Sequence, residues 1–206
     1  RLAIEHDDVI ELAKHSDVPV ISGLTNLEHP CQALADVLTI KEHFGSFENK
    51  KICFVGDGNN VCNSLLLIAP LLGMDMSVAC PEGYEPNEDI IKIALEYAEE
   101  NNTEITISSD INVALDNVDV VYTDVWVSMG DEAEAAKREI DLKPYQVHEK
   151  LMALANDDAI FMHCLPAVRG HEVAAEVIDG PQSVVYDEAE NRLHAQKAIL
   201  YYYLKD

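Results

Sequence analysis

The most constraining feature of this sequence is an alternation, from Lys51 onward, of short apolar runs with longer amphipathic stretches. The apolar runs are rich in β-branched residues, and several of them end at Gly, Pro or Asp. This alternation is the pattern of βαβ units, in which helices join parallel strands and cover the faces of a sheet. We therefore predict an α/β protein built on a parallel sheet.

The hydrophobic pattern also predicts where each element lies. We expect strands at residues 51–56, 75–80, 103–108, 118–123, 159–162 and 183–186, and helices at 61–72, 87–101, 145–155 and 190–204. Gly73 should end the first of these helices in a left-handed conformation, and Asp110 should cap a further short helix. The predicted fold class is a doubly wound, Rossmann-like parallel sheet with flanking helices.

Residues 1–50 have a different pattern. We expect an amphipathic helix at 1–18, a very short strand at 20–21, and a long helix at 30–44 in which Pro30 suits the first turn. We interpret these elements as the tail of a preceding α/β domain. Because the chain begins within a pattern and without Met, we expect that a preceding segment is missing.

Composition excludes several classes of partner. The 206 residues, 48% of them hydrophobic, can build a substantial core. A net charge of −24 would repel a phosphate backbone, so we expect no nucleic-acid partner. No apolar run approaches the roughly 20 residues of a membrane span, so we expect no membrane partner. The five cysteines lack a C-x-x-C pair, and we interpret them as reduced thiols of a cytoplasmic protein.

The first motif with possible chemistry, His163-Cys164-Leu165-Pro166, directly follows the apolar run 159–162. Polar groups at the end of a buried strand are often binding or catalytic groups in α/β proteins. Taken alone, the pair fits a packed loop better, because a buried Cys usually behaves as a small inert hydrophobe. We expect no zinc site, because adjacent side chains should diverge and no second pair completes four ligands.

A second motif, His29-Pro30-Cys31-Gln32, stands at the start of the predicted long helix. Backbone N–H groups at a helix start favour anionic or carbonyl oxygens. His29 could donate to a carbonyl oxygen that gains negative charge, and Gln32 could both donate to and accept from an amide-like group. Taken alone, the motif favours a proline-initiated helix with a capping His and a surface Gln.

A third motif runs from Asp124 to Gly130, after the strand predicted at 118–123. The Asp124 carboxylate could pair with a substrate ammonium group, and Ser128 could accept a hydrogen bond from the same group. Met129 continues a loop that precedes an acidic stretch. The alternative is a helix cap formed by Ser128 or Asp131.

The Gly56-Asp57-Gly58-Asn59-Asn60 segment partly matches a dinucleotide-binding fingerprint. Val61 replaces the third glycine of that fingerprint, and Asp75 comes too early to bind a ribose hydroxyl. These departures disfavour a nicotinamide-dependent dehydrogenase. The segment could also be a turn that only reverses the chain.

Together, the four segments resemble the signature set of the aspartate/ornithine carbamoyltransferases, and specifically of the members that use ornithine. The resemblance covers nearly the whole chain, in order. It implies attack by the neutral δ-amine of L-ornithine on carbamoyl phosphate, giving citrulline and phosphate without a metal or organic cofactor. The loop of Ser128 and Met129 is what separates the ornithine-using members from relatives that use aspartate or putrescine.

The resemblance also implies a role for individual residues. His29, Cys164 and Arg192 would be catalytic. The carbamoyl phosphate would be bound by His29, Gln32, the Leu165 carbonyl and Arg192. The ornithine would be bound by Asn60, Asp124, Ser128, Met129 and Cys164. For Arg192 the alternative is a surface side chain paired with Glu188 or Glu190, which contributes little in water.

By the same resemblance, residues 1–30 are a remnant of the carbamoyl-phosphate domain, 31–46 an interdomain helix, 50–188 the ornithine-binding domain, and 189–206 a returning C-terminal helix. The family's Ser-x-Arg-Thr phosphate loop does not occur here. We therefore expect a fragment that is inactive alone and belongs to a homotrimer, or a multiple of trimers, when full length. Alternatives are a non-catalytic amino-acid-binding fragment and a relative that uses another amine, such as putrescine.

Overall fold

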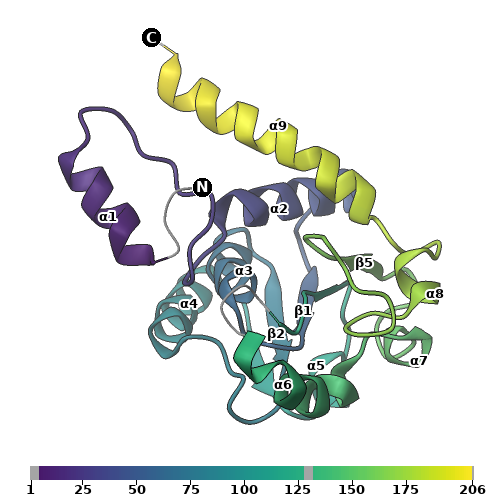
Figure 1. Ribbon diagram of the computed structural model, residues 1–206. Coiled ribbons are helices and arrows are strands. Elements are labelled where there is room, and N and C mark those ends of the chain that lie inside the picture. The colour runs from purple at the N-terminus through teal and green to yellow at the C-terminus, as the bar shows by residue number, and fades with distance from the viewer. Residues whose placement is uncertain (1–4, 128–131, 206) are drawn as a thin grey trace.

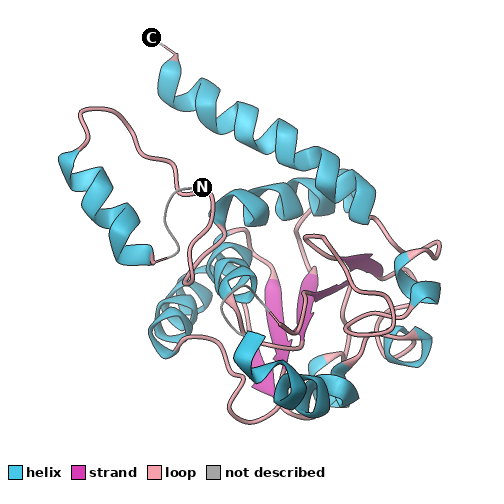
Figure 2. Ribbon diagram, viewed as in Figure 1, coloured by secondary structure: helices cyan, strands magenta, loops and turns pink. Residues whose placement is uncertain are grey.

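A computed structural model describes residues 5–127 and 132–205. Its centre is a five-stranded sheet in the order β3-β2-β1-β4-β5, and every neighbouring pair is parallel (Figures 1 and 2). The strands are β1 (Lys51–Val55), β2 (Asp75–Ala79), β3 (Ile105–Ser108), β4 (Val120–Thr123) and β5 (Ile160–Met162). The direction of the chain across the sheet reverses between β1 and β4, so the predicted doubly wound α/β fold is confirmed.

Helices cover both faces of this sheet (Figure 1). They are α1 (His6–His15), α2 (Pro30–Phe44), α3 (Asn60–Leu71), α4 (Glu88–Asn101), α5 (Ile111–Ala114), α6 (Ala135–Leu142), α7 (Glu149–Met152), α8 (Ala175–Ile178) and α9 (Val185–Leu204), with 3₁₀ turns at Glu132–Glu134 and Lys143–Tyr145. Among the described residues, no helix combines the length and apolarity that crossing a bilayer requires.

Alternating residues of the strands supply two separate cores. Ile52 and Phe54 of β1 pack with residues of α2, α3 and α4, whereas Cys53 and Val55 pack with residues of α5, α7 and α8. Successive side chains of a strand point to opposite faces, so a strand buried on both sides is apolar throughout. This explains why the apolar runs of the sequence are continuous.

The helix ends follow local signals that the sequence shows. Asn59, Asn87 and Asp110 cap α3, α4 and α5 by accepting hydrogen bonds from backbone N–H groups of the first turn. Gly73 has a φ of +77°, which confirms the predicted left-handed residue after α3. The helix predicted at 30–44 is α2, with Pro30 at its first position.

Four predicted elements differ from the structure, and tertiary contacts explain two of these differences. Residues 183–186 do not form a strand: Ser183 makes one isolated bridge to Phe161, after which α9 begins at Val185. The helix predicted at 145–155 is shortened to α7, because the buried Val147 pairs with Val173 in an extended conformation. No strand forms at 20–21, and the helix predicted at 1–18 is limited to α1.

Helix α9 packs along α2, although the two helices lie at opposite ends of the sequence (Figure 1). Asn191 is buried in this contact, and its Nδ2 donates to Thr39 Oγ1 at 3.0 Å and to Glu42 Oε2 at 2.8 Å. The C-terminal part of α9 extends beyond the body of the molecule and exposes Tyr201, Tyr202 and Tyr203.

Candidate active site

The carboxyl ends of β1, β4 and β5 bring three of the sequence motifs to one edge of the sheet. Cys164 Sγ, after β5, donates to Asp124 Oδ1, after β4, at 3.1 Å. Asn59 Nδ2, after β1, donates to Asp124 Oδ2 at 2.7 Å. Both oxygens of the Asp124 carboxylate therefore accept a hydrogen bond, and the carboxylate is held in one orientation.

Asn59 has two functions at this edge. Its Oδ1 accepts from the backbone N–H groups of Val61 and Cys62 and caps α3, while its Nδ2 binds Asp124. Sequence reasoning singled out the neighbouring Asn60 and missed Asn59. The signal was present, because Asn directly before a helix is a typical N-cap.

The Cys164 thiol is neutral at ordinary pH. Burial raises the pKa of this thiol well above its usual value, and the neighbouring Asp124 carboxylate raises the pKa further. A thiolate is the nucleophilic form of cysteine, so this environment disfavours nucleophilic catalysis. It suits a side chain that positions a substrate and exchanges hydrogen bonds with it.

Asn60 directly follows Asn59 in the chain, but its side chain binds the loop before α2. Asn60 Nδ2 donates to the Thr25 carbonyl at 2.6 Å, and Asn63 Nδ2 donates to the Leu27 carbonyl at 2.9 Å. The backbone N–H of His29 donates to Ser64 Oγ at 2.7 Å. The first turns of α3 thus hold the loop that leads into α2.

His29 occupies the N-cap position of α2, yet its side chain does not cap the helix. The alternative of a capping His is therefore wrong. Gln32 is only 1% exposed, so the alternative of a surface Gln is also wrong. The N-terminal turn of α2 instead directs Gln32 into the contact with α9.

Arg192 reaches Gln32 from the second turn of α9. Its Nη1 donates to Gln32 Oε1 at 2.6 Å, and Glu190 pairs with His194 instead. The alternative of a surface Arg192 paired with Glu190 is not what the structure shows. In the structure the side chains of Arg192 and Gln32 are therefore hydrogen-bonded to each other.

His163 supports the loop through hydrogen bonds. It is fully buried: its Nδ1 accepts from the Leu165 N–H at 2.9 Å, and its Nε2 lies 3.2 Å from Glu172 Oε1. An Nδ1 that accepts a backbone N–H leaves the proton of a neutral ring on Nε2, which can donate to Glu172. Leu165 has a φ of +54°, and the Leu165–Pro166 peptide bond is cis. The packed-loop interpretation therefore applies to His163, whereas Cys164 belongs to the site.

Ser128 and Met129 lie outside the described residues. Helix α6 is bound to the turn at residues 56–60, which follows β1. Arg138 Nη1 of α6 donates to Asp57 Oδ2 at 2.6 Å and to the Trp126 carbonyl at 3.1 Å. This ion pair is largely buried, with side-chain exposures of 12% and 15%. It connects the turn after β1 with the segment after β4.

Comparison with known proteins agrees with this geometry. Residues 48–203 match the family model described as the Asp/Orn binding domain of aspartate/ornithine carbamoyltransferase, and residues 1–42 match its carbamoyl-P binding domain. The chain belongs to the aspartate/ornithine carbamoyltransferase family. It is 80% identical over 203 residues to the ornithine carbamoyltransferase of Methanobrevibacter smithii, covering 98% of this chain and 67% of that protein.

Further carbamoyltransferases show the same partial coverage. The ornithine carbamoyltransferase of Methanothermobacter thermautotrophicus is 61% identical, over 99% of this chain and 67% of that protein. The solved ornithine carbamoyltransferase of Pyrococcus furiosus is 52% identical with a TM-score of 0.93, and the match covers 97% of this chain and 64% of that one. The chain thus spans about two thirds of the length of these carbamoyltransferases.

The described part of this carbamoyltransferase chain contains a group that resembles a metal site. Potential ligand atoms of Asp124, His163 and Cys164 lie within 4.8 Å of one another. The prediction that the adjacent His163 and Cys164 side chains diverge is therefore wrong. An ion held there would have to displace the hydrogen bond that His163 makes to Leu165 or to Glu172.

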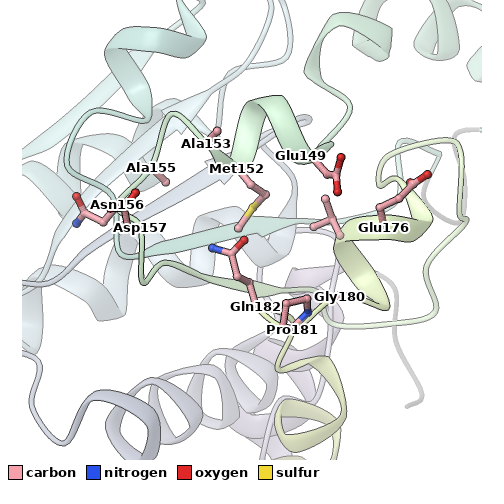
Figure 3. A pocket seen from close by; sticks show the side chains of 11 residues that line it. Glu149, Met152, Ala153, Ala155, Asn156, Asp157, Glu176, Gly180, Pro181 and Gln182 are labelled. Atoms are coloured by element: carbon pink, nitrogen blue, oxygen red, sulfur yellow. The ribbon is translucent and has the colours of Figure 1, made fainter.

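Described residues of the chain form hollows on its surface. One, of about 310 Å³, is lined by residues of α7, α8 and the segment 180–182, and contains none of the predicted site residues (Figure 3). Another, of about 420 Å³, lies between α1 and the start of α3 and is lined in part by Gly58, Asn59 and Asn63. The second hollow therefore borders the cluster of Asn59 and Asp124.

Proposed function

We propose that this protein transfers the carbamoyl group of carbamoyl phosphate to the δ-amine of L-ornithine, giving L-citrulline and phosphate. The observation that carries the proposal is the Asp124–Cys164–Asn59 cluster at the carboxyl edge of the sheet, where α/β proteins bind ligands. Relatives described as ornithine carbamoyltransferases that are 80%, 61% and 59% identical also support it. The reaction would serve arginine biosynthesis or the interconversion of ornithine and citrulline.

The proposed ornithine-binding residues are Asn60, Asp124, Ser128, Met129 and Cys164. Asp124 is a carboxylate fixed by donors from Asn59, Cys164 and the Val125 N–H, and it can pair with the α-ammonium group of an amino acid. The amide of Asn60 would turn from the Thr25 carbonyl to the ornithine carboxylate. A neutral Cys164 next to the δ-amine would position this amine without competing as a nucleophile.

The proposed carbamoyl-phosphate-binding residues are His29, Gln32, Leu165 and Arg192. His29 and Arg192 would stabilise the negative charge that develops on the carbonyl oxygen when the amine attacks. Leu165 adopts a left-handed φ that is uncommon for a residue other than glycine, and His163 holds it there. Such a conformation suits a carbonyl that must accept from the carbamoyl NH₂ group.

The proposed reaction needs no metal or organic cofactor. The amine forms a bond to the carbonyl carbon, phosphate leaves with the electron pair of the broken bond, and the δ-nitrogen loses a proton. The catalytic contribution is proximity, to which Cys164 adds by positioning the amine, together with charge stabilisation by His29 and Arg192. We propose further that the full-length enzyme is a cytoplasmic homotrimer or a multiple of trimers, and that this chain alone has little activity.

A second candidate function is binding of ornithine without turnover. It is favoured by one observation, namely that the family's carbamoyl-P binding domain is matched over residues 1–42 and its Asp/Orn binding domain over 48–203. A chain with most of the Asp/Orn binding domain and little of the carbamoyl-P binding domain could bind ornithine without binding carbamoyl phosphate.

The test measures citrulline formation from carbamoyl phosphate and ornithine, together with calorimetric binding of ornithine. Both the 206-residue chain and the product of its complete reading frame are assayed, with putrescine as the competing amine. We expect citrulline from the complete protein and ornithine binding by both. Asp124→Asn should abolish both signals, while Asp89→Asn, at an exposed position, should leave them unchanged. Turnover of putrescine in preference to ornithine would overturn the proposed substrate.

A further inference from the structure

Two carboxyl groups, Asp36 on α2 and Glu188 on α9, are completely buried where these helices meet β4. Each residue is 0% exposed. Gln32 Nε2 donates to Asp36 Oδ1 at 2.9 Å and to Glu188 Oε1 at 3.1 Å, so one amide group joins both acids. Moving two carboxylates out of water is strongly unfavourable, and a buried acid avoids this cost by keeping its proton.

Hydrogen-bond donors surround the two acids unequally. Glu188 accepts from Gln32, from Tyr122 Oη at 3.0 Å and from the His163 N–H at 2.9 Å. Asp36 accepts from Gln32, while its buried Oδ2 accepts from no donor in the described ranges of the chain. Donors stabilise the charged form of a carboxyl group, so the negative charge belongs on Glu188. With three donors on Glu188, a proton shared by the two buried carboxyl groups belongs on Asp36.

The other charged and titratable groups that face the pair favour a single negative charge. Arg192, on α9, is the cation whose charge acts on Asp36. Tyr122 on β4 and Cys164 after β5 have pKa values raised well above the usual range by burial, so both are neutral at pH 7. Asp124, after β4, adds a further negative charge nearby. One arginine therefore balances one carboxylate at this position.

The pair also fixes how the Gln32 amide is turned. Both acids accept from its Nε2, so its Oε1 must point the other way, toward Arg192 Nη1 at 2.6 Å. An amide turned by 180° would place its oxygen against Glu188 and its NH₂ group against the guanidinium. The orientation of Gln32 and the position of Arg192 thus depend on the two acids.

We propose that Asp36 and Glu188 share one proton, held on Asp36, and that this proton-sharing pair is a positioning device for Gln32 and Arg192. The location of the proton follows from the hydrogen bonds alone. The positioning role rests on the proposed function, because it assigns Gln32 and Arg192 to the carbamoyl group. Burial raises the pKa of both carboxyl groups, that of Asp36 to about 7, so the pair retains a proton near neutral pH.

Loss of the shared proton should disturb the site. A second buried negative charge would draw the Arg192 guanidinium toward the acids and away from Gln32 Oε1. Binding of carbamoyl phosphate should then weaken as the pH rises above the pKa of the pair. Binding of ornithine, at the Asp124 edge, should change much less.

The first experiment locates the proton by infrared spectroscopy of the folded 206-residue chain in D₂O near neutral pD. A protonated carboxyl group has a C=O stretch that ionised carboxylates lack. We expect this band in the unmodified protein and in Asp89→Asn, which changes an exposed acid, and we expect its loss in Asp36→Asn. Absence of the band in the unmodified protein, or its persistence in Asp36→Asn, would overturn the proposal.

The second experiment tests positioning in the enzyme from the complete reading frame. The amide introduced by Asp36→Asn can reproduce the donor of a protonated Asp36, so this variant should lose the alkaline rise in KM for carbamoyl phosphate. Glu188→Gln places an amide against the donors Tyr122 and His163, and should raise this KM by about tenfold. Its KM for ornithine should stay within about twofold. An unchanged alkaline rise in Asp36→Asn would refute the positioning role.

The two experiments separate this proposal from the proposed function. If the complete protein forms no citrulline, the proposed function fails, whereas the infrared band still decides where the proton lies. If citrulline forms but the band is absent, the proton-sharing pair fails and the proposed function stands.

Discussion

At the scale of single residues, the contact between the Cys164 thiol and the Asp124 carboxylate decides which chemistry the thiol can perform. A cysteine beside a cation would lose its proton, but this one donates its proton to an anion at 3.1 Å. Burial and the charge of Asp124 both raise the pKa of the thiol. Cys164 is therefore a hydrogen-bond donor, and Asp124 is the anionic group of the site.

The reactivity of Cys164 provides a test. We expect slow alkylation by iodoacetamide at pH 7, because the thiolate is the reactive form and is scarce here. Asp124→Asn removes the neighbouring charge that raises the thiol pKa, so its Cys164 should react about tenfold faster at the same pH. Mass spectrometry of the peptide that contains Cys164 measures the rate. Asp89→Asn is the charge-matched control, and rapid alkylation of the unmodified protein at pH 7 would contradict the prediction.

At the scale of elements, the start of α3 contributes both to the stability of the fold and to the geometry of the site. Asn59 caps the helix with its oxygen and binds Asp124 with its nitrogen. Asn87 caps α4 in the same way, through the N–H groups of Asp89 and Ile90, and neither of these hydrogen bonds involves Asp124. The two residues form a natural matched pair.

Replacing either asparagine with alanine should lower the free energy of unfolding by about 1 kcal/mol, the usual contribution of an N-cap. Only Asn59→Ala should also weaken ornithine binding, by about tenfold, because Asp124 loses the donor that binds its Oδ2. Urea unfolding measures the first effect and calorimetry the second. Equal ornithine affinity in Asn59→Ala and Asn87→Ala would show that the Asn59–Asp124 contact has no functional role.

At the scale of the whole molecule, the packing of α2 against α9 should make stability depend on pH. In the folded protein Asp36 keeps its proton to a pKa of about 7, compared with 3.8 in its unperturbed state. Between these values the folded state binds a proton that the unfolded chain releases. The free energy of unfolding should therefore fall as the pH rises through this window, and the stabilisation is complete below its lower limit.

Urea unfolding at pH 5 and pH 7.5 measures this dependence. The unmodified protein should be more stable at pH 5, and Asp36→Asn should reduce the difference, because its amide does not titrate. The net charge of −24 also destabilises the folded state as the acids ionise, so the measurements belong in high salt, which screens exposed charges. An identical difference in Asp36→Asn would mean that the titrating group is another one.

The parallel strands, several helix ends and the edge of the sheet that carries the site followed from local patterns. Strand runs such as 51–56 are apolar on both sides, and Asp124 and Cys164 follow runs that must end at the same edge. By contrast, the strand predicted at 183–186 failed because one bridge to Phe161 is followed at once by α9. At residues 183–186, tertiary packing outweighs the local preference for a strand.

Periodicity and turn residues act over a few positions, so they predict the parallel α/β fold and the helix ends, whereas the family resemblance predicts that Asp124 and Cys164 share a site. The burial of Gln32 and its contact with Glu188, 156 positions away, depend on tertiary packing. Tertiary packing also buries Asp36 beside Gln32. The pKa of a carboxyl group depends on the solvent and charges around it, and these neighbours come together only when α9 packs on α2.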